Sequence, residues 1–183
     1  MTELRAYGHA DLPAIRRILL DVHAEAYADQ MDDPFHQRFA WFVDHWGRNP
    51  GFACVIGWEG DEPVGFAYGA PGVAGREWWR GHLAEPPADP STFSVSELMV
   101  RPAWRRTGTA ERLHAALLEP RPEALAVLLV DTTHDRVQAL YESWEYAKVG
   151  EQQPFPDSPR FAVMLRHLVP RQRGAESPWS ADC

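Results

Sequence analysis

Lysine is almost absent from this chain of 183 residues, because all but one of its 18 basic residues, Lys148, are arginine. These 18 face 26 acidic residues, and the formal net charge is −8. General nucleic-acid binding relies on clustered basic side chains that neutralise phosphates, and the chain has no long basic run, so we expect no nucleic-acid partner. The acidic excess would suit a cationic ligand, but it is equally an ordinary solubility feature.

Long apolar runs and cysteines are scarce as well. No stretch approaches the ~18 consecutive apolar residues of a membrane-spanning helix, and residues 1–5 lack the apolar segment of a signal peptide. The two cysteines, Cys54 and Cys183, are too few for a disulfide framework. No pair among the 8 histidines has H-x-x-x-H spacing. We therefore expect a reduced, cytoplasmic protein with no membrane association and no metal site.

Aromatic residues are plentiful, with 8 tryptophans, 5 tyrosines and 8 phenylalanines, and hydrophobic residues make up 45% of the chain. This content is enough to bury one core, and the length lies within the ~100–200 residues of a single domain. We expect that domain to span residues 1–168. Residues 169–183 lack periodicity and predict a mobile tail.

The order of apolar patterns predicts a mixed α/β domain. Helical spacing recurs at 11–26, 35–46, 108–118 and 137–144. Strand patterns occur at 4–7, 52–58, 63–68, 92–100, 125–130, 146–151 and 160–168. The helix between the strands at 92–100 and 125–130 requires these two to run parallel, after an antiparallel meander. The Gly- and Pro-rich segment 69–91 predicts a functional or mobile loop.

The turn after the strand at 92–100 has the chemistry of an anion site. It leads directly into a helix, whose first N–H groups have no intrahelical partner and lie at the positive end of the helix dipole. Gly108 has no Cβ to keep a ligand away from the backbone, and Arg101 and two arginines of the turn add positive charge. The residues of the turn and the helix start are Arg105, Arg106, Thr107, Gly108, Thr109 and Ala110. This pattern predicts a phosphate or pyrophosphate site, with an ordinary glycine-containing turn as the alternative.

The same residues resemble a known signature. Arg105-x-x-Gly108-x-Ala110, preceded by Leu98-x-Val100-x-Pro102-x-Trp104, is similar to the acyl-CoA motif R/Q-x-x-G-x-G/A of the GCN5-related N-acetyltransferases (GNAT). The resemblance implies the GNAT fold, in which a central, mostly antiparallel sheet is splayed between its two parallel strands. It also implies acetyl-CoA as co-substrate and a small amine-bearing acceptor. Family members often dimerise, which leaves a homodimer open.

The resemblance also assigns cofactor-binding residues. Backbone groups of residues 98–100 would face the pantetheine arm, and an N–H near Met99 or Val100 would polarise the thioester carbonyl. The N–H groups of residues 105–110 would hold the pyrophosphate. The full predicted set is Leu98, Met99, Val100, Arg105, Arg106, Thr107, Gly108, Thr109, Ala110 and His134.

Two residues are expected to move protons. Tyr141 matches the family position that protonates the departing CoA thiolate, and a neutral tyrosine with a pKa of about 10 is able to donate to a basic thiolate. Glu97 is the candidate base that accepts the proton of the attacking amine, directly or through water, with Ser94 and Ser96 as relay groups. The alternatives are a purely structural Tyr141 in the core and a Glu97 without a role in proton transfer.

Two departures from the family pattern lie near the helix at 137–144. His134 stands where the family usually has Asn, which weakens the expected side-chain contact with the cofactor and leaves an ordinary helix-start residue as the alternative. Glu145-Tyr146 replaces Gly-Phe. Because Glu adopts the left-handed conformation less freely than Gly, we expect a differently shaped helix end.

The acceptor is not identified by the sequence. A polyamine, an antibiotic amine, a metabolite and a protein N-terminus remain open, as do another acyl group, a hydroxyl acceptor and a non-catalytic CoA-binding module. Aromatic residues in the helical stretch 35–46, together with Trp78 and Trp79, are candidates for lining the acceptor pocket.

Overall fold

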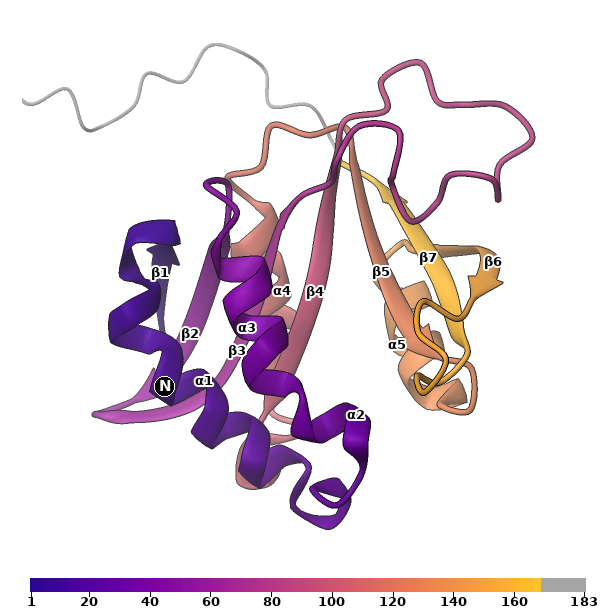
Figure 1. The fold of residues 1–183 in the computed structure, drawn as a ribbon. Coiled ribbons are helices and arrows are strands. Elements are labelled where there is room, and N and C mark those ends of the chain that lie inside the picture. The colour runs from indigo at the N-terminus through magenta and orange to yellow at the C-terminus, as the bar shows by residue number, and fades with distance from the viewer. Residues whose placement is uncertain (169–183) are drawn as a thin grey trace, which may run out of the picture.

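A seven-stranded sheet forms the centre of residues 1–168, the part of the chain that the computed structural model describes (Figure 1). The strand order is β1-β2-β3-β4-β5-β7-β6. Every neighbouring pair is antiparallel except β4 and β5, which are parallel. The strands are β1 Glu3–Gly8, β2 Ala53–Glu59, β3 Glu62–Pro71, β4 Thr92–Val100, β5 Leu125–Asp131, β6 Ala147–Gln152 and β7 Phe161–His167. The mixed α/β prediction is confirmed, whereas the predicted tail at 169–183 lies outside the described residues.

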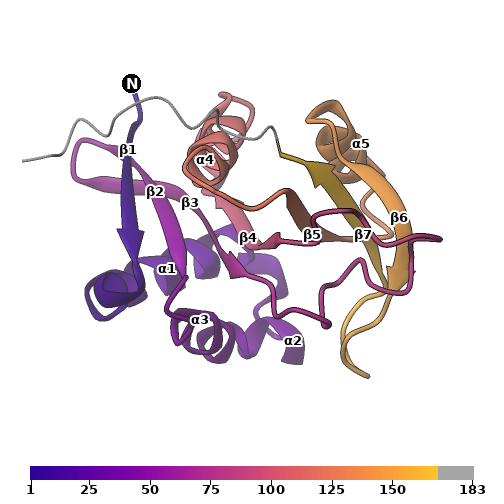
Figure 2. The same cartoon turned by 90° about the horizontal axis from the view of Figure 1, so that it is seen from above.

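Helices cover both faces of the sheet (Figure 2). On one face lie α1 (Leu12–Ala26), α2 (Pro34–Gln37) and α3 (Phe39–Gly47), and on the other lie α4 (Thr109–Leu118) and α5 (Asp135–Ser143). Helical spacing aligns the apolar residues of α1, α3 and α4 with the sheet, where they join the two largest buried clusters of the described residues. Short 3₁₀ turns occupy His9–Asp11, Ala28–Gln30 and Pro102–Trp104. Among these residues, no helix has the length and apolar character needed to cross a membrane.

The helical stretch expected at 35–46 is divided into two helices. The carboxylate of Asp33 accepts a hydrogen bond from the N–H of Phe35 at 2.7 Å and begins α2, which ends after one turn. Arg38 separates the two helices, with φ −87° and ψ 5°. Its guanidinium donates to the carboxylate of Asp157 at 2.8 Å, which joins this junction to the segment between β6 and β7. A tertiary contact therefore accompanies the break that periodicity did not predict.

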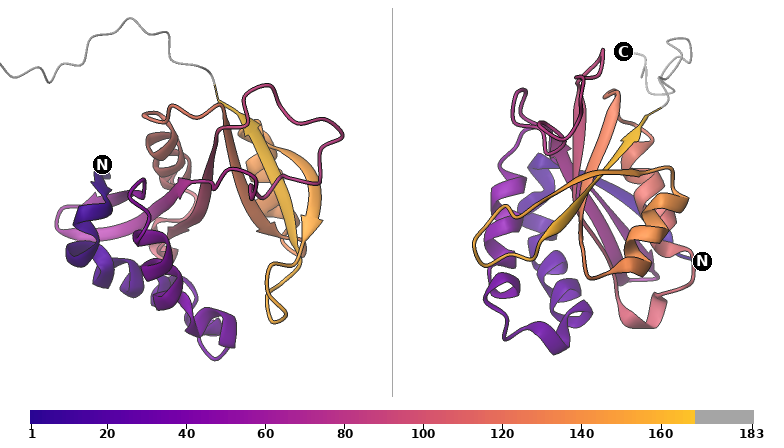
Figure 3. Two further views of the ribbon diagram at one scale, coloured as in Figure 1. Left: turned by 45° about the horizontal axis from the view of Figure 1, so that its top comes forward. Right: turned by 90° about the vertical axis from the view of Figure 1, so that its right-hand side faces the viewer.

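Strands β4 and β5 part soon after they meet. Only residues 92–94 of β4 pair with β5, opposite residues 125–127. In the pairing with β3, Tyr68 lies opposite Glu97 and Gly69 lies opposite Val95, so Ser96 is an extra residue in a β-bulge. Beyond the bulge β4 stays paired with β3, and β5 stays paired with β7. A gap therefore opens between β4 and β5 (Figure 3). The splayed sheet that the family resemblance implied is confirmed.

The C-terminal end of α5 corrects one expectation. Glu145 adopts the left-handed conformation with φ 69°. The N–H of Tyr146 donates to the carbonyl of Tyr141 at 3.1 Å, and the N–H of Glu145 donates to the carbonyl of Glu142 at 3.1 Å. This is the Schellman arrangement that normally contains Gly, so the helix end keeps its usual shape despite the substitution. The predicted change of shape is wrong, because the surrounding hydrogen bonds hold Glu145 in a strained conformation.

Replacing Glu145 with Gly is expected to stabilise the protein by roughly 1 kcal/mol, because Gly adopts a positive φ without steric strain. The exposed hydrogen bond between Glu145 and Arg166 would be lost at small cost. The matched change Glu142→Gly, inside α5, should destabilise by about 1 kcal/mol. Urea unfolding measures both free energies. A Glu145→Gly variant less stable than the parent would contradict the assignment of strain.

Candidate active site

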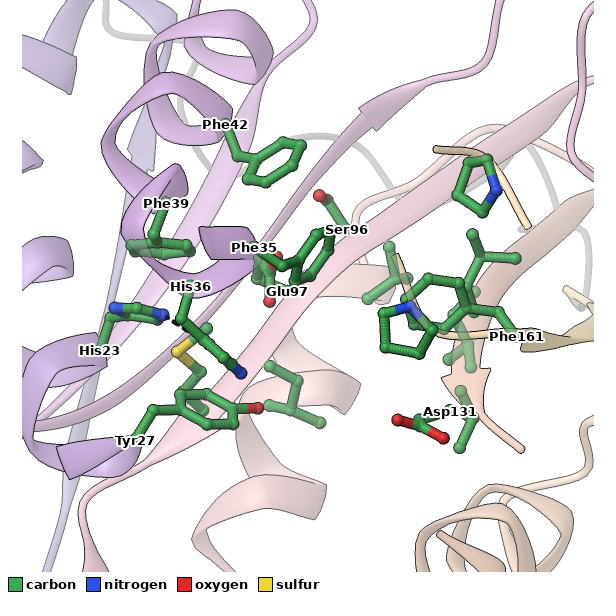
Figure 4. Close-up of a pocket in the computed structure, with 18 of the residues that line it drawn as sticks. His23, Tyr27, Phe35, His36, Phe39, Phe42, Ser96, Glu97, Asp131 and Phe161 are labelled. Carbon is green, nitrogen blue, oxygen red and sulfur yellow. Dashed lines mark hydrogen bonds between the residues drawn. The ribbon is translucent and has the colours of Figure 1, made fainter. Parts of the chain in front are cut away.

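A cleft of about 600 Å³ opens where β4 and β5 part (Figure 4). Residues of α1, α2, α3, β4, β5, α5 and the segment between β6 and β7 line it. Five residues from the predicted site are among them, namely Glu97, Leu98, Met99, His134 and Tyr141. The structure thus brings both expected proton-transfer residues to one cleft.

Glu97 lies on β4 directly after the bulge. Burial raises the pKa of its carboxyl to about 8. This group is therefore mostly protonated at pH 7 and half ionised at about pH 8. Such a carboxylate is a much stronger base than an ordinary glutamate with a pKa of about 4.3. Ser96, one of the two proposed relay groups, lines the cleft beside Glu97, whereas Ser94 is buried and does not line it.

Tyr27 and Tyr141 face the same part of the cleft as Glu97. Burial, together with the charge of Glu97, raises the pKa of Tyr27 to about 12 against the opposing effect of Arg105. Burial likewise raises the pKa of Tyr141 well above its ordinary value, and the charges of Glu97 and Tyr27 raise it further. Three titratable groups, from the C-terminal end of α1, from β4 and from α5, therefore interact electrostatically. Both phenols stay protonated throughout the neutral range.

The ring of Tyr141 is fixed from behind by aromatic neighbours. It meets Trp144 edge-on at 5.3 Å and Tyr146 edge-on at 5.6 Å between ring centroids. The hydroxyl of Tyr146 is hydrogen bonded to Nε2 of the buried His114 at 2.8 Å, which holds this cluster together. The hydroxyl of Tyr141 makes no hydrogen bond to another described residue. Tyr141 is thus packed in the core and also lines the cleft. This position is compatible with the predicted role as acid and with the structural alternative.

The turn predicted to bind an anion, here termed the cradle (residues 105–110), leads into the N-terminus of α4. Gly108 is the N-cap residue and has a left-handed φ of 79°, and a Cβ added there would meet nothing within 4 Å. Arg106, also left-handed with φ 61°, belongs to the same turn. The N–H groups of residues 106–110 donate to no acceptor among the described residues, whereas that of Arg105 donates to the carbonyl of Pro102 at 3.3 Å. Consecutive free N–H groups at a helix N-terminus are the arrangement that binds phosphate.

The side chains of the turn have different partners. Arg105 donates to the carbonyls of Val100 at 3.2 Å and Ala26 at 2.9 Å, so its guanidinium fixes the turn against the end of α1. Arg101 forms an ion pair with Glu25. Only Arg106, of the three arginines predicted to add charge, makes no such contact with a described residue. The cradle therefore consists mainly of backbone N–H groups with one unpaired guanidinium beside them.

Some candidates lie away from the cleft. The side chain of Val100 packs into the core against α4, so any contact with a cofactor would be made by its backbone. Trp78 lines the cleft as expected, but Trp79 is buried and donates to the hydroxyl of Thr92 at 2.9 Å. Trp79 is therefore a core residue and not part of an acceptor pocket. Val137 of α5 is exposed at the cleft, although helical spacing placed it with the core residues.

Sequence reasoning missed three cleft residues near α1 and α2, namely His23, Tyr27 and His36. Tyr27 lies beyond the end of α1, and Nε2 of His23 lies 3.3 Å from Nδ1 of His36 (Figure 4). Burial, and next the charge of His36, lowers the pKa of His23 to about 4, so this imidazole is neutral at pH 7. No local motif marks these residues. The one available signal was the density of aromatic residues and histidines between 23 and 46.

Comparison with known proteins identifies the family. A model of the acetyltransferase (GNAT) family matches residues 12–146. No curated protein sequence gave a significant match. Among the described residues, no group of three or more His, Cys, Asp and Glu is arranged to hold a metal ion.

Solved structures share the fold at low sequence identity. A GNAT acetyltransferase from Bacillus cereus has a TM-score of 0.62 at 14% identity, over 92% of this chain and 99% of that one. The ribosomal-protein-S18-alanine N-acetyltransferase of Escherichia coli has a TM-score of 0.61 at 17% identity, over 97% and 100%. An aminoglycoside 6'-N-acetyltransferase complexed with coenzyme A has a TM-score of 0.61 at 18% identity, over 93% and 99%. At such identities the likeness establishes the fold and leaves the acceptor open.

Glu97→Gln is expected to make stability less dependent on pH. The native pKa of about 8 lies above the ordinary value of 4.5, so the unfolded chain ionises first as pH rises. Stability from the protonated native carboxyl is complete below about pH 4.5 and is lost progressively up to about pH 8. Urea unfolding between pH 4 and 9 should therefore show a steeper decline for the parent than for Glu97→Gln. The matched change at exposed Glu62 should leave the slope unaltered, and parallel curves for the parent and Glu97→Gln would refute the raised pKa.

Proposed function

This chain belongs to the acetyltransferase (GNAT) family, and we propose that it transfers the acetyl group of acetyl-CoA to a primary amine of a small molecule or peptide. The observation that carries the proposal is the placement of Glu97 and Tyr141 in one cleft between parted parallel strands. The cradle of free N–H groups lies just beyond the end of β4. One site thus combines an anion-binding end with two groups suited to proton transfer.

The residues present fit acetyl-CoA. The N–H groups of residues 106–110 would hold the pyrophosphate, with Arg106 adding charge, and Gly108 supplies a backbone surface free of side-chain atoms. Leu98 and Met99 lie on β4 beside the gap, where that strand is paired with β3 but not with β5, so the backbone groups on the β5 side are available to the pantetheine arm. When bound, acetyl-CoA supplies an acetyl group activated as a thioester.

Glu97 acts as the base. An amine attacks only when it is neutral, yet a lysine-like amine has a pKa of about 10 and is mostly protonated at pH 7. The ionised form of Glu97, with its pKa raised to about 8, accepts the amine proton as the new C–N bond forms. Ser96, beside Glu97 at the cleft, is placed to pass the proton through water.

Tyr141 acts as the acid on the other side of the reaction. It donates its phenolic hydrogen to the sulfur as the C–S bond breaks, and solvent later returns a proton to the phenolate. Burial keeps Tyr141 protonated and also makes it a weaker acid. Burial raises the pKa of a thiol as well, so donation to the departing sulfur is favourable while the cleft excludes water.

Three other functions share most of these features. A non-catalytic CoA-binding module would need the cradle and the gap, but it would not need Glu97 and Tyr141 in one cleft. Transfer of another acyl group, or transfer to a hydroxyl, would use the same residues. Release of CoA from acetyl-CoA with a panel of amines separates acetyl transfer to amines from these alternatives. Thermal stabilisation by acetyl-CoA without release of CoA by any amine would favour the non-catalytic module.

Tyr141→Phe is expected to lower kcat about 100-fold, because general acid catalysis contributes roughly 10²–10⁴-fold. The Kd for acetyl-CoA should change less than about twofold, since the ring and its packing are kept. Tyr7→Phe, on β1 and outside the cleft, is the matched control and should leave kcat unchanged. Thiol release measures kcat and calorimetry measures Kd. Full activity in Tyr141→Phe would remove this residue from the mechanism.

Gly108→Val is expected to weaken acetyl-CoA binding at least about tenfold, because a β-branched residue disfavours the positive φ of the cradle. Gly60→Val is the matched control, since Gly60 also has a positive φ, 61°, with nothing within 4 Å of an added Cβ, and lies in the β2–β3 turn. Both variants carry similar backbone strain, so a loss of affinity confined to Gly108→Val reports the cradle. Equal affinities in the two variants would overturn the pyrophosphate assignment.

A further inference from the structure

Beyond Glu97 the cleft is bounded by an aromatic wall. Its members come from α2, α3, the 69–91 loop and the region from β6 to β7, and are Phe35, Phe42, Trp46, Trp78, Phe155 and Phe161. Their ring centroids lie 5.3 Å apart for Phe35 and Phe42, and 5.9 Å for Phe42 and Phe155. Phe35 and Phe161 meet across the cleft at 6.4 Å. Figure 4 shows Phe35 and Phe42 on the side of Glu97, with Phe161 opposite.

These rings are not ordinary core residues. Phe39, Phe52 and Phe66 belong to the core and are at most 4% exposed. All six members of the aromatic wall are only half-buried, and each lines the cleft. Apolar surface that is left open inside a concave site is the usual lining for the apolar body of a small ligand.

The charges around the cleft further restrict the chemical class of the acceptor. No Lys or Arg of the described residues lines it, so a carboxylate or phosphate on the acceptor would meet no permanent positive charge there, only the imidazoles of His23, His36, His45 and His134. Carboxylates are few. Asp33 is exposed, Glu97 is mostly protonated at pH 7, and Oδ1 of Asp131 accepts hydrogen bonds from the N–H and hydroxyl of Thr133 at 2.8 and 2.7 Å. A polycation, which needs several free carboxylates, is poorly matched.

Arg38 holds two parts of the aromatic wall together and is not free to bind the acceptor. Its guanidinium lies 5.7 Å from the ring centroid of Phe42 and 5.4 Å from that of Phe155. Its charge is paired with Asp157 at 2.8 Å. The α2–α3 junction and the segment between β6 and β7 are thereby joined, which fixes the distance between the two sides that a ligand would contact.

From this arrangement we infer that the acceptor is a monoamine carried on an aromatic or bulky apolar body, which lies against the aromatic wall with its amino group directed toward Glu97. The inference rests on the proposed function, because it names the acceptor of that reaction. It selects among the amines that the sequence left open, and it disfavours polyamines and aminoglycosides.

The test compares 2-phenylethylamine with n-butylamine, spermidine and kanamycin, in both thiol release and calorimetric binding in the presence of CoA. We expect kcat/KM for 2-phenylethylamine to exceed that for each of the others at least about tenfold, which corresponds to burial of the ring. Phe161→Ala and Phe35→Ala should each raise KM for 2-phenylethylamine by about three- to tenfold, with kcat nearly unchanged. Val73→Ala, at an exposed apolar residue outside the cleft, is the control.

The outcomes separate the two proposals. Turnover of spermidine, kanamycin or n-butylamine as good as that of 2-phenylethylamine would overturn the acceptor class and leave acetyl transfer standing. Binding of 2-phenylethylamine that Phe161→Ala weakens, without release of CoA from any amine, would support the aromatic wall as the ligand site and overturn acetyl transfer to amines. If 2-phenylethylamine does not bind and none of the four amines releases CoA, both proposals are overturned.

Discussion

Strands β4 and β5 are hydrogen bonded only over residues 92–94 and 125–127, and beyond this point each keeps a partner on one side alone. Backbone groups inside a protein need hydrogen-bond partners, so such a gap persists only where a ligand or water supplies them. The bulge at Ser96 occurs where the strands part, and the next residue of β4 is Glu97. The cleft, the position of the candidate base and the direction of β4 toward the cradle all follow from this separation.

Burial explains the chemistry proposed for the cleft. An exposed glutamate is too weak a base for an amine, and burial is the main cause of the raised pKa of Glu97. The same burial keeps Tyr27 and Tyr141 protonated, which suits Tyr141 to the proposed role of acid. The proposed base, Glu97, and the proposed acid, Tyr141, therefore share one buried environment, and their different roles follow from their different side chains. The cradle works differently, because its N–H groups carry partial charge at every pH.

The sequence predicted those parts of the site that depend on contiguous residues. A left-handed Gly108 followed by a helix start determines the cradle locally, and the parallel relation of β4 and β5 follows from the intervening helix. The acceptor side was predicted only in part, through the aromatic residues of 35–46 and Trp78, because Tyr27 and Phe161 are distant from them in sequence and join them only through the sheet topology. Local rules failed at Arg38, where a tertiary contact with Asp157 accompanies the break between α2 and α3, and at Glu145, which is left-handed without being Gly.

The central claim is that the gap between β4 and β5 holds acetyl-CoA while its acetyl group is transferred to an amine, with Glu97 as the base and Tyr141 as the acid. A crystal structure of the protein with CoA tests this claim most directly. The account predicts the pyrophosphate on the N–H groups of residues 106–110, and the sulfur in the cleft within hydrogen-bonding reach of the Tyr141 hydroxyl. CoA bound elsewhere, or a sulfur remote from Tyr141 with Glu97 on no path to it, would contradict the account.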